Sequence, residues 1–265
     1  MQPLNSVNEL KNIINNQQLT PVYQPIVQLS EENIFAHEAL IRGPVNSDFH
    51  LPKALFKHAA DNDLLAPLEL TCREISCRHF AAADNGGKLF LNVSPMSLLE
   101  PGYINGTTNR ILEQLHIDPR RVVIEISEQY PLDDYQLIRN ATDHYRNMGF
   151  EIAIDDLGAG YAGLRSWSEI RPEYVKVDRH FIHNINNDAI KYRFVECIQQ
   201  IARDIGCRVI AEGVETTAEL AAVRDVGIDL CQGYLLGKPK PPPFSNVASQ
   251  YVSIKNNNSL KLCCV

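Results

Sequence analysis

The segment Val122-Val123-Ile124-Glu125-Ile126 is almost entirely apolar and carries one carboxylate near its end. Such a short run rich in β-branched residues is typical of a strand that is buried on both faces, as the strands of parallel sheets are. Two further segments, Ile152–Ile154 (IAI) and Arg208–Ala211 (RVIA), have the same character. This recurrence favours a parallel sheet whose strands are joined by crossover helices.

Eight segments of this kind are predicted strands, and stretches with helical spacing lie between most of them. Thr216 and Glu219 form a capping-box pattern at one helix start, and another predicted helix carries an apolar stripe of Ile190, Phe194, Cys197, Ile198 and Ile201. The fold class is therefore α/β, a TIM-like (β/α)8 barrel with a modified first strand, and no G-x-G-x-x-G or phosphate-loop motif supports an open doubly wound sheet. The predicted strands are Val22–Val27, Ile34–Ile41, Lys88–Val93, Val122–Ile126, Glu151–Ile154, Glu173–Val177, Arg208–Ala211 and Ile228–Gln232.

Composition narrows the function classes. The 265 residues include 25 basic and 32 acidic side chains, a net charge of −7, which disfavours nucleic-acid polymers and anionic membranes as partners. The seven cysteines are an odd number without zinc-like spacing, and we expect reduced thiols in a cytoplasmic protein or a cytoplasmic domain of a larger one. No apolar run approaches the length of a membrane span, so we expect no membrane insertion of this segment.

Polar side chains recur at or near the carboxyl ends of seven predicted strands. In a barrel these ends converge on one mouth, where such folds carry out chemistry. Each residue alone could cap a helix or start a turn, but several carboxylates in one mouth must either raise their pKa values or bind a cation. The residues are Glu38, Asn92, Glu125, Asp155 with Asp156, Lys176, Glu212 and Gln232.

This set of ligand types suits magnesium or manganese, because its donors are oxygens of carboxylates and an amide. Zinc is disfavoured, since this set contains no histidine or cysteine ligand and no histidine lies at these strand ends. Two divalent cations sharing a water could hydrolyse a phosphoester, and the same site could stabilise an enolate formed from a carboxylate substrate. Residue types alone leave these two reactions open.

Eight short runs decide between them, because in this order they closely resemble the EAL-domain family over about residues 5 to 245. The resemblance implies a barrel phosphodiesterase that linearises cyclic di-GMP to pGpG with magnesium or manganese. The runs are Tyr23-Gln24-Pro25-Ile26-Val27, Glu38-Ala39-Leu40-Ile41-Arg42, Leu91-Asn92-Val93-Ser94, Glu125-Ile126-Ser127-Glu128, Asp155-Asp156-Leu157-Gly158-Ala159-Gly160-Tyr161, Val175-Lys176-Val177-Asp178, Ala211-Glu212-Gly213-Val214-Glu215 and Gln232-Gly233-Tyr234.

The resemblance also implies roles for individual residues. Lys176 and Glu212 are the implied catalytic residues, with Lys176 either orienting the nucleophilic water or deprotonating it, and Glu128 anchors the loop after the fifth strand. One metal ion is held by Glu38, Asn92, Glu125 and Asp155, and a second lies near Asp155, Asp156 and Glu212. The implied substrate-binding residues are Gln24, Leu40, Arg42, Glu215 and Gln232.

The chain departs from the family in the loop after the fifth strand. Leu157, Ala159, Ala162 and Gly163 stand where the family usually has phenylalanine, threonine and a serine pair, so hydroxyls that could order the loop are absent. We therefore expect activity that is modest or strongly dependent on dimerisation. A cyclic di-GMP receptor without catalysis and a metal-dependent lyase are the alternatives.

The expected organisation is a phosphodiesterase domain over residues 1–245 and a tail or linker over 246–265. The resemblance implies a homodimer and regulatory domains that are fused to this segment or act as partners.

Overall fold

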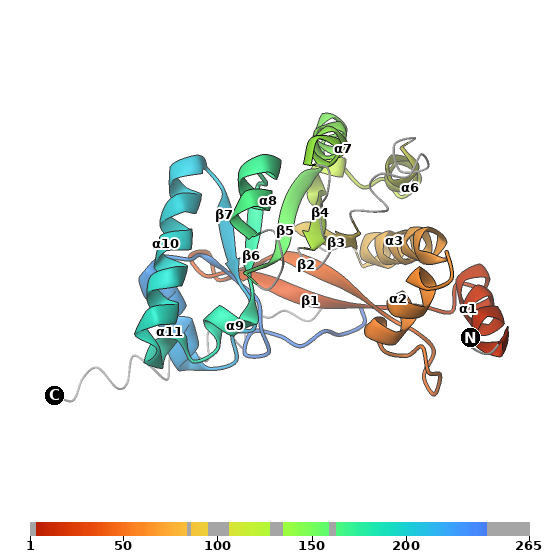
Figure 1. Cartoon of the computed structure of the whole chain (residues 1–265), viewed down its shortest axis with the longest axis horizontal. Helices are drawn as coiled ribbons and strands as arrows, with labels where there is room; N and C mark the ends of the chain where they lie inside the picture. The colour runs from red at the N-terminus through yellow and green to blue at the C-terminus, as the bar shows by residue number, and fades with distance from the viewer. Residues whose placement is uncertain (1–3, 84–85, 95–105, 128–134, 159–162, 243–265) are drawn as a thin grey trace.

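The eight strands of the protein close into a barrel in their sequence order (Figure 1). The computed structural model describes residues 4–83, 86–94, 106–127, 135–158 and 163–242. The prediction of a TIM-like barrel is confirmed, and each predicted strand overlaps an observed one. These are β1 (Thr20–Gln28), β2 (Asn33–Arg42), β3 (Lys88–Val93), β4 (Val122–Ser127), β5 (Glu151–Leu157), β6 (Tyr174–Val177), β7 (Arg208–Ala211) and β8 (Leu230–Cys231).

The first strand is the modified one, as predicted. β1 pairs antiparallel with both β2 and β8, whereas every neighbouring pair from β2 to β8 is parallel. Residues 29–32 alone join β1 to β2. Because a parallel connection needs about a dozen residues or more, this short link permits only a hairpin.

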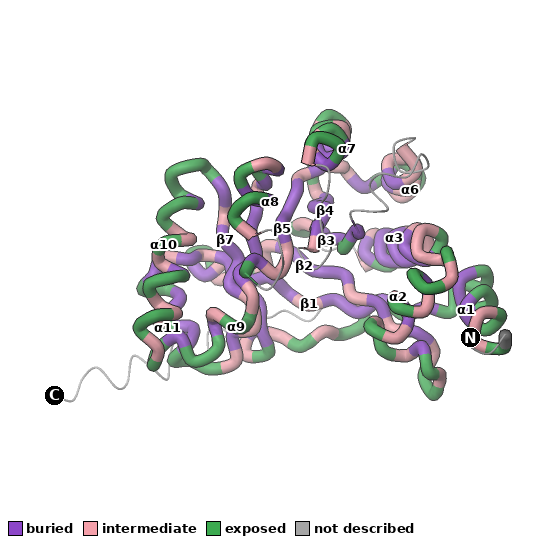
Figure 2. The backbone as a smooth tube through the Cα atoms, viewed as in Figure 1, coloured by how far each residue is buried: buried purple, intermediate pink, exposed green. Residues whose placement is uncertain are grey.

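Helices surround the barrel on several sides (Figures 1 and 2). Helices α1, α2 and α3 form a second apolar cluster at the amino-terminal side, around Leu10, Leu55 and Leu68. Among the described residues no helix is long and apolar enough to cross a membrane. The α-helices are α1 (Leu4–Asn15), α2 (Pro52–Ala60), α3 (Leu65–Ala82), α6 (Thr107–Gln114), α7 (Tyr135–Asn147), α8 (Gly163–Ile170), α9 (Arg179–Ile182), α10 (Ala189–Ile205) and α11 (Thr217–Val226).

Of the two helices predicted in most detail, α11 has the expected start, whereas α10 buries a different face from the one predicted. The capping box at the start of α11 is confirmed, since the Thr216 side chain accepts from the Glu219 amide and the Glu219 carboxylate accepts from the Thr216 amide. Helix α10 is also confirmed, but its apolar stripe is not a buried face. Ile190 is 71% exposed and Phe194 57%, while the opposite face buries Val195 and Ala202.

A single layer of apolar side chains fills the barrel, with one residue from each strand. It consists of Ile26, Ala36, Phe90, Val123, Ala153, Tyr174, Ile210 and Leu230, and all are buried. Side chains on a strand alternate between its two faces, so the residue two positions further on points into the barrel again. The apolar layer thereby fixes which residues occupy the next layer toward the mouth.

Candidate active site

The layer directly above the apolar one is polar on every strand. Each of its residues lies two positions from an apolar-layer residue, toward the carboxyl end on the parallel strands and toward the amino end on the antiparallel β1. The alternation of strand side chains therefore gathers eight polar groups from distant parts of the sequence. They are Gln24, Glu38, Asn92, Glu125, Asp155, Lys176, Glu212 and Gln232.

Lys176 lies among the carboxylates of this layer and is 1% exposed. Its Nζ atom is 2.8 Å from Glu125 Oε1, 2.9 Å from Asp155 Oδ1, 2.8 Å from Glu212 Oε1 and 3.2 Å from Glu38 Oε2. Burial would lower the pKa of Lys176, but the four carboxylates outweigh it and raise this pKa well above its ordinary value. The side chain is therefore an ammonium cation at neutral pH and is no base in this arrangement.

The carboxylate of Glu38 is held by three donors. Asn92 Nδ2 donates to its Oε1 at 3.0 Å, and Gln232 Nε2 and Lys176 Nζ donate to its Oε2 at 2.7 and 3.2 Å. Burial alone would raise the pKa of Glu38, but Lys176 and the two amides outweigh it, and the pKa lies below its ordinary value. Glu38 is therefore ionised and oriented before any ligand arrives.

The pKa values of Glu125 and Glu212 are shifted in the opposite direction to that of Glu38. Burial is the main cause that raises the pKa of each well above its ordinary value, and Asp155 and Glu38 add to it, although Lys176 opposes the shift. Glu125 is completely buried, and its Oε2 has no hydrogen-bond partner among the described residues. One ammonium group thus leaves this acidic layer short of positive charge, which a divalent cation could supply.

The donors also fit a metal ion by position. Asp155, Asp156 and Glu212 each offer a carboxylate oxygen, and these oxygens lie within 4.8 Å of one another. Asp156 breaks the alternation of β5, because its φ of 58° is in the left-handed region and the pairing of β5 with β6 shifts register between Ile154 and Leu157. This irregularity lets one strand present two adjacent carboxylates to the same site.

Two cavities open on either side of this centre. The first, about 340 Å³, lies between the ends of β2 and β3 and helices α2 and α3, and the second, about 430 Å³, lies beside the ends of β7 and β8. Glu38, Leu40 and Asp156 line both of them. The mouth is therefore a two-part site with the acidic centre in the middle.

Four of the five predicted substrate-binding residues line the second cavity, and the fifth lines neither cavity. Gln24, Leu40, Glu215 and Gln232 line the second cavity, whereas Arg42 lines neither and donates to the Ile41 carbonyl at 2.8 Å. Glu128, predicted to anchor a loop, lies outside the described residues, as does the predicted tail from 246 to 265.

Several residues that line the two cavities were missed at the sequence level. Arg179 and Tyr234 line the second cavity, and Arg179 Nη2 is 2.9 Å from Glu215 Oε1. Glu69 and Arg73 of α3 line the first cavity. Charged residues four positions apart, each next to an apolar residue (Leu68 and Cys72), were the available signal for this second pair.

The fold and the site together define a class: a TIM-like barrel protein with a metal-competent acidic centre at the carboxyl ends of its strands. Within that class the chain belongs to the EAL domain family, whose model matches residues 7–239.

Solved structures of family members superpose closely. A standalone versatile EAL protein from Vibrio cholerae O395 in its c-di-GMP-bound form is 28% identical, with a TM-score of 0.76 over 84% of this chain and 92% of that one. BlrP1 of Klebsiella pneumoniae, in a complex with manganese and the same dinucleotide, is 29% identical, with a TM-score of 0.78 over 84% of this chain and 56% of that one. A calcium complex of BlrP1 matches equally well, with a TM-score of 0.78.

Among curated relatives, the probable cyclic di-GMP phosphodiesterase PdeG of Escherichia coli K12 is 29% identical over 87% of this chain and 46% of its own length. The cyclic di-GMP phosphodiesterase PdeF of the same organism is 27% identical over 89% of this chain and 32% of its length. The chain thus spans 32–46% of the length of these relatives.

Proposed function

We propose that this chain is a metal-dependent phosphodiesterase that hydrolyses cyclic di-GMP to linear pGpG. The two-part mouth carries the proposal. Cyclic di-GMP has two guanosines joined through two phosphates, and two cavities of similar size flank one acidic centre. With a guanosine in each cavity, a phosphodiester would lie over that centre, beside Glu38 and Asp156.

The proposed cofactors are two divalent cations, Mg²⁺ or Mn²⁺, because the donors are oxygens. Glu38, Asn92, Glu125 and Asp155 would hold one, and Asp155, Asp156 and Glu212 the other. When bound, such ions lower the pKa of a water molecule and neutralise the phosphoryl charge.

The chain's own residues then have separate tasks. Lys176, held protonated by four carboxylates, donates hydrogen bonds and orients the attacking water rather than deprotonating it. Glu212 Oε1 lies 2.8 Å from Lys176 Nζ and at the edge of the second cavity, where it can accept a proton from that water. Gln232 and Asn92 keep the Glu38 carboxylate in place through their amide hydrogen bonds.

Incubation of the purified chain with cyclic di-GMP, with either manganese or EDTA, tests the proposal. Linear product only in the presence of metal supports it, tight binding without turnover identifies a receptor, and neither binding nor turnover overturns it. Glu38→Ala should abolish turnover because it removes an ionised ligand. The matched control Glu31→Ala removes an exposed carboxylate that accepts from the neighbouring Asn33 side chain, and it should leave turnover unchanged.

We further propose that the chain forms a homodimer through the exposed face of α10. This face borders an apolar groove of about 640 Å³ that Leu157, Leu164 and Phe181 also line. An apolar groove that continues onto exposed apolar residues of a helix is a candidate interaction site.

The exposed face is also self-complementary. If two α10 helices packed antiparallel about a twofold axis near Cys197 and Ile198, each exposed apolar residue would meet another, and opposite charges would face each other. The resulting pairs are Phe194 with Ile201, Ile190 with Ile205, and Lys191 with Asp204.

Sedimentation at several concentrations tests this dimer. Phe194→Glu should shift the chain to monomer, whereas Val45→Glu, at a position that is 75% exposed outside α10, should not. A wild-type chain that is monomeric at every concentration contradicts the proposed dimer. Because Leu157 and Gly158 follow Asp156 directly and line this groove, we expect turnover of the monomeric variant to fall as well.

We propose that the chain is a cytoplasmic protein or a cytoplasmic domain of a larger protein. Regulatory domains are either fused to it or bind it as partners. The greater length of the curated relatives supports fused domains. The five described cysteines are free, which agrees with a reducing compartment.

A further inference from the structure

The segment Glu212–Glu215 lies between β7 and α11 and carries two carboxylates of the mouth. Glu212 belongs to the polar layer, and Glu215 lines the second cavity. Different cations pair with these two carboxylates. Lys176 Nζ lies 2.8 Å from Glu212 Oε1, and Arg179 Nη2 lies 2.9 Å from Glu215 Oε1. The orientation of Glu215 is therefore controlled separately from that of Glu212.

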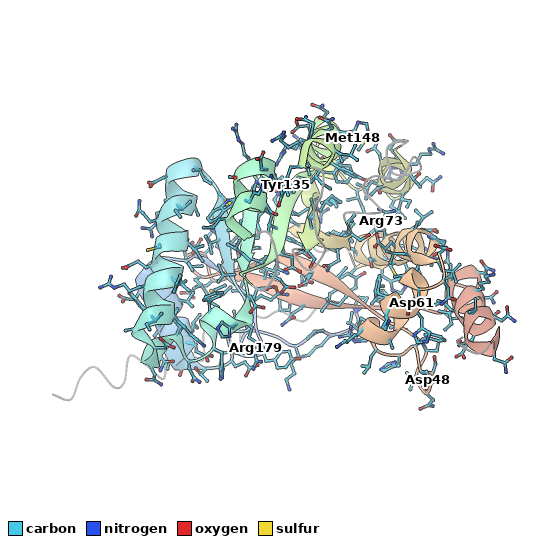
Figure 3. All side chains as sticks on the ribbon, viewed as in Figure 1. Asp48, Asp61, Arg73, Tyr135, Met148 and Arg179 are labelled. Atoms are coloured by element: carbon cyan, nitrogen blue, oxygen red, sulfur yellow. The ribbon has the colours of Figure 1, made fainter. Side chains whose placement is uncertain are left out.

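Arg179 reaches Glu215 across Gly213. It is the first residue of α9 and comes from that side of the barrel, away from Arg73 on α3 (Figure 3). Gly213 has a φ of 68°, and a Cβ atom at this position would lie 2.3 Å from Arg179 Cγ and 2.7 Å from Arg179 Cδ. The aliphatic part of the arginine therefore occupies the space that any other side chain at position 213 would need. Only glycine permits this close approach.

Arg179 also determines the charge of the second cavity. Among the described residues that line this cavity, Arg179 alone carries a positive charge, and five carry carboxylates: Glu38, Asp156, Asp178, Glu212 and Glu215. Metal ions at the acidic centre would offset Glu38, Asp156 and Glu212, but Glu215 lies outside the proposed set of ligands. Arg179 is therefore the cation that offsets Glu215 when a phosphate-bearing ligand is bound.

Stability does not account for this ion pair. The side chain of Arg179 is 56% exposed and that of Glu215 is 34% exposed, and such pairs contribute little to the free energy of unfolding because water screens them. An oriented carboxylate favours binding, however, because a side chain that is already ordered loses less conformational entropy when a ligand arrives. The pair is therefore better explained by preparation of the cavity for a ligand than by folding.

We propose that Arg179 is a positioning residue of the second cavity, which holds the Glu215 carboxylate in the orientation that accepts hydrogen bonds from the nucleoside bound there. Arg179 acts through Glu215 and not on the reacting atoms, because Lys176 is the cation that pairs with Glu212. This inference rests on the proposed function, since it assigns a task within the same site.

Arg179→Met tests the assignment, with cyclic di-GMP as substrate and manganese as the metal. Methionine keeps an unbranched apolar stem but has no charge. We expect KM to rise about 3- to 10-fold, the cost of ordering one flexible side chain on binding, while kcat stays within about twofold of the wild type. Arg179→Lys keeps the charge and should recover part of the loss. The matched control Arg120→Met breaks the exposed pair of Arg120 with Asp118, which precedes β4 at the end of the barrel away from the mouth, and should change neither constant.

A double-mutant cycle with Glu215→Ala distinguishes positioning from a general effect of charge or packing. If Arg179 acts through Glu215, Arg179→Met causes no further rise in KM once the Glu215 carboxylate is absent. The inference is overturned, and the proposed function left intact, by an equal rise in both backgrounds, an unchanged KM, a fall in kcat alone or a Tm well below that of the wild type. A wild-type chain that neither binds nor cleaves cyclic di-GMP overturns both proposals.

Discussion

Replacement of Lys176 by methionine should make the stability of this protein depend on bound metal. Methionine has a similar length but no charge, so Glu38, Glu125, Asp155 and Glu212 would lose an ammonium that lies within 3.2 Å of each. Removing one partner of a buried ion pair costs about 3–5 kcal/mol. In a domain of this size that corresponds to a fall in Tm of roughly 6–20 °C.

Thermal unfolding in EDTA and in manganese is the appropriate assay. In EDTA the Lys176→Met variant should melt well below the wild type, and manganese should stabilise it more than it stabilises the wild type. Lys57→Met removes a lysine whose side chain is 67% exposed and should change little. A Lys176→Met protein that melts with the wild type in EDTA would refute the view that this ammonium holds the acidic layer together.

The pH dependence of the same variant has a definite sign. Burial raises the pKa values of Glu125 and Glu212 above the ordinary value of 4.5. At pH values between 4.5 and these raised pKa values, the folded protein therefore binds protons that the unfolded chain has released. Stability without metal therefore falls as pH rises, and the loss of Lys176 should make the fall steeper. Burial lowers the pKa of His37 to about 4, which gives the opposite slope below its ordinary value of 6.5, but this contribution is common to both proteins and cancels when the slopes of the Lys176→Met variant and the wild type are compared.

Two further predictions concern the metal site. Manganese affinity, measured by calorimetry, should increase with pH as Glu125 and Glu212 lose their protons, and an affinity independent of pH would contradict their raised pKa values. Asp156→Gly should raise the free energy of unfolding by about 1 kcal/mol, because glycine adopts a φ of 58° without strain. The same substitution should reduce the number of manganese ions bound, and an unchanged stoichiometry would show that Asp156 is no ligand.

The residues of the polar layer could be predicted from the sequence, because the alternation of side chains along each strand determines which of them point into the barrel. Once β4 is placed by its apolar run, Val123 and Glu125 must point the same way, and the same spacing applies to Tyr174 and Lys176. The hairpin of β1 and β2 also follows from local length. These features depend on residues close together in the chain.

Other features depend on contacts that no local pattern contains. Ile190 and Phe194 have the spacing of a buried helix face, yet Val195 and Ala202 are the residues that pack against the barrel. When one helix has two apolar faces, the face that is buried can be identified only once the neighbouring elements are known. Arg73 reaches the mouth because α3 packs beside β3, and its distance from Asn92 in the sequence gives no indication of this.

Asp156 shows how a departure from regular structure can add a function to the barrel. A regular strand offers the mouth one side chain in each layer, and seven of the eight strands follow that rule. β5 offers two adjacent carboxylates because Asp156 adopts a positive φ where the pairing with β6 shifts register. The two proposed ion sites would therefore have different structural origins: strand alternation alone would build the first, and the irregularity of β5 would build the second. A substitution that restores regular geometry at Asp156 should accordingly weaken the second site while Glu38, Asn92 and Glu125 still bind an ion at the first.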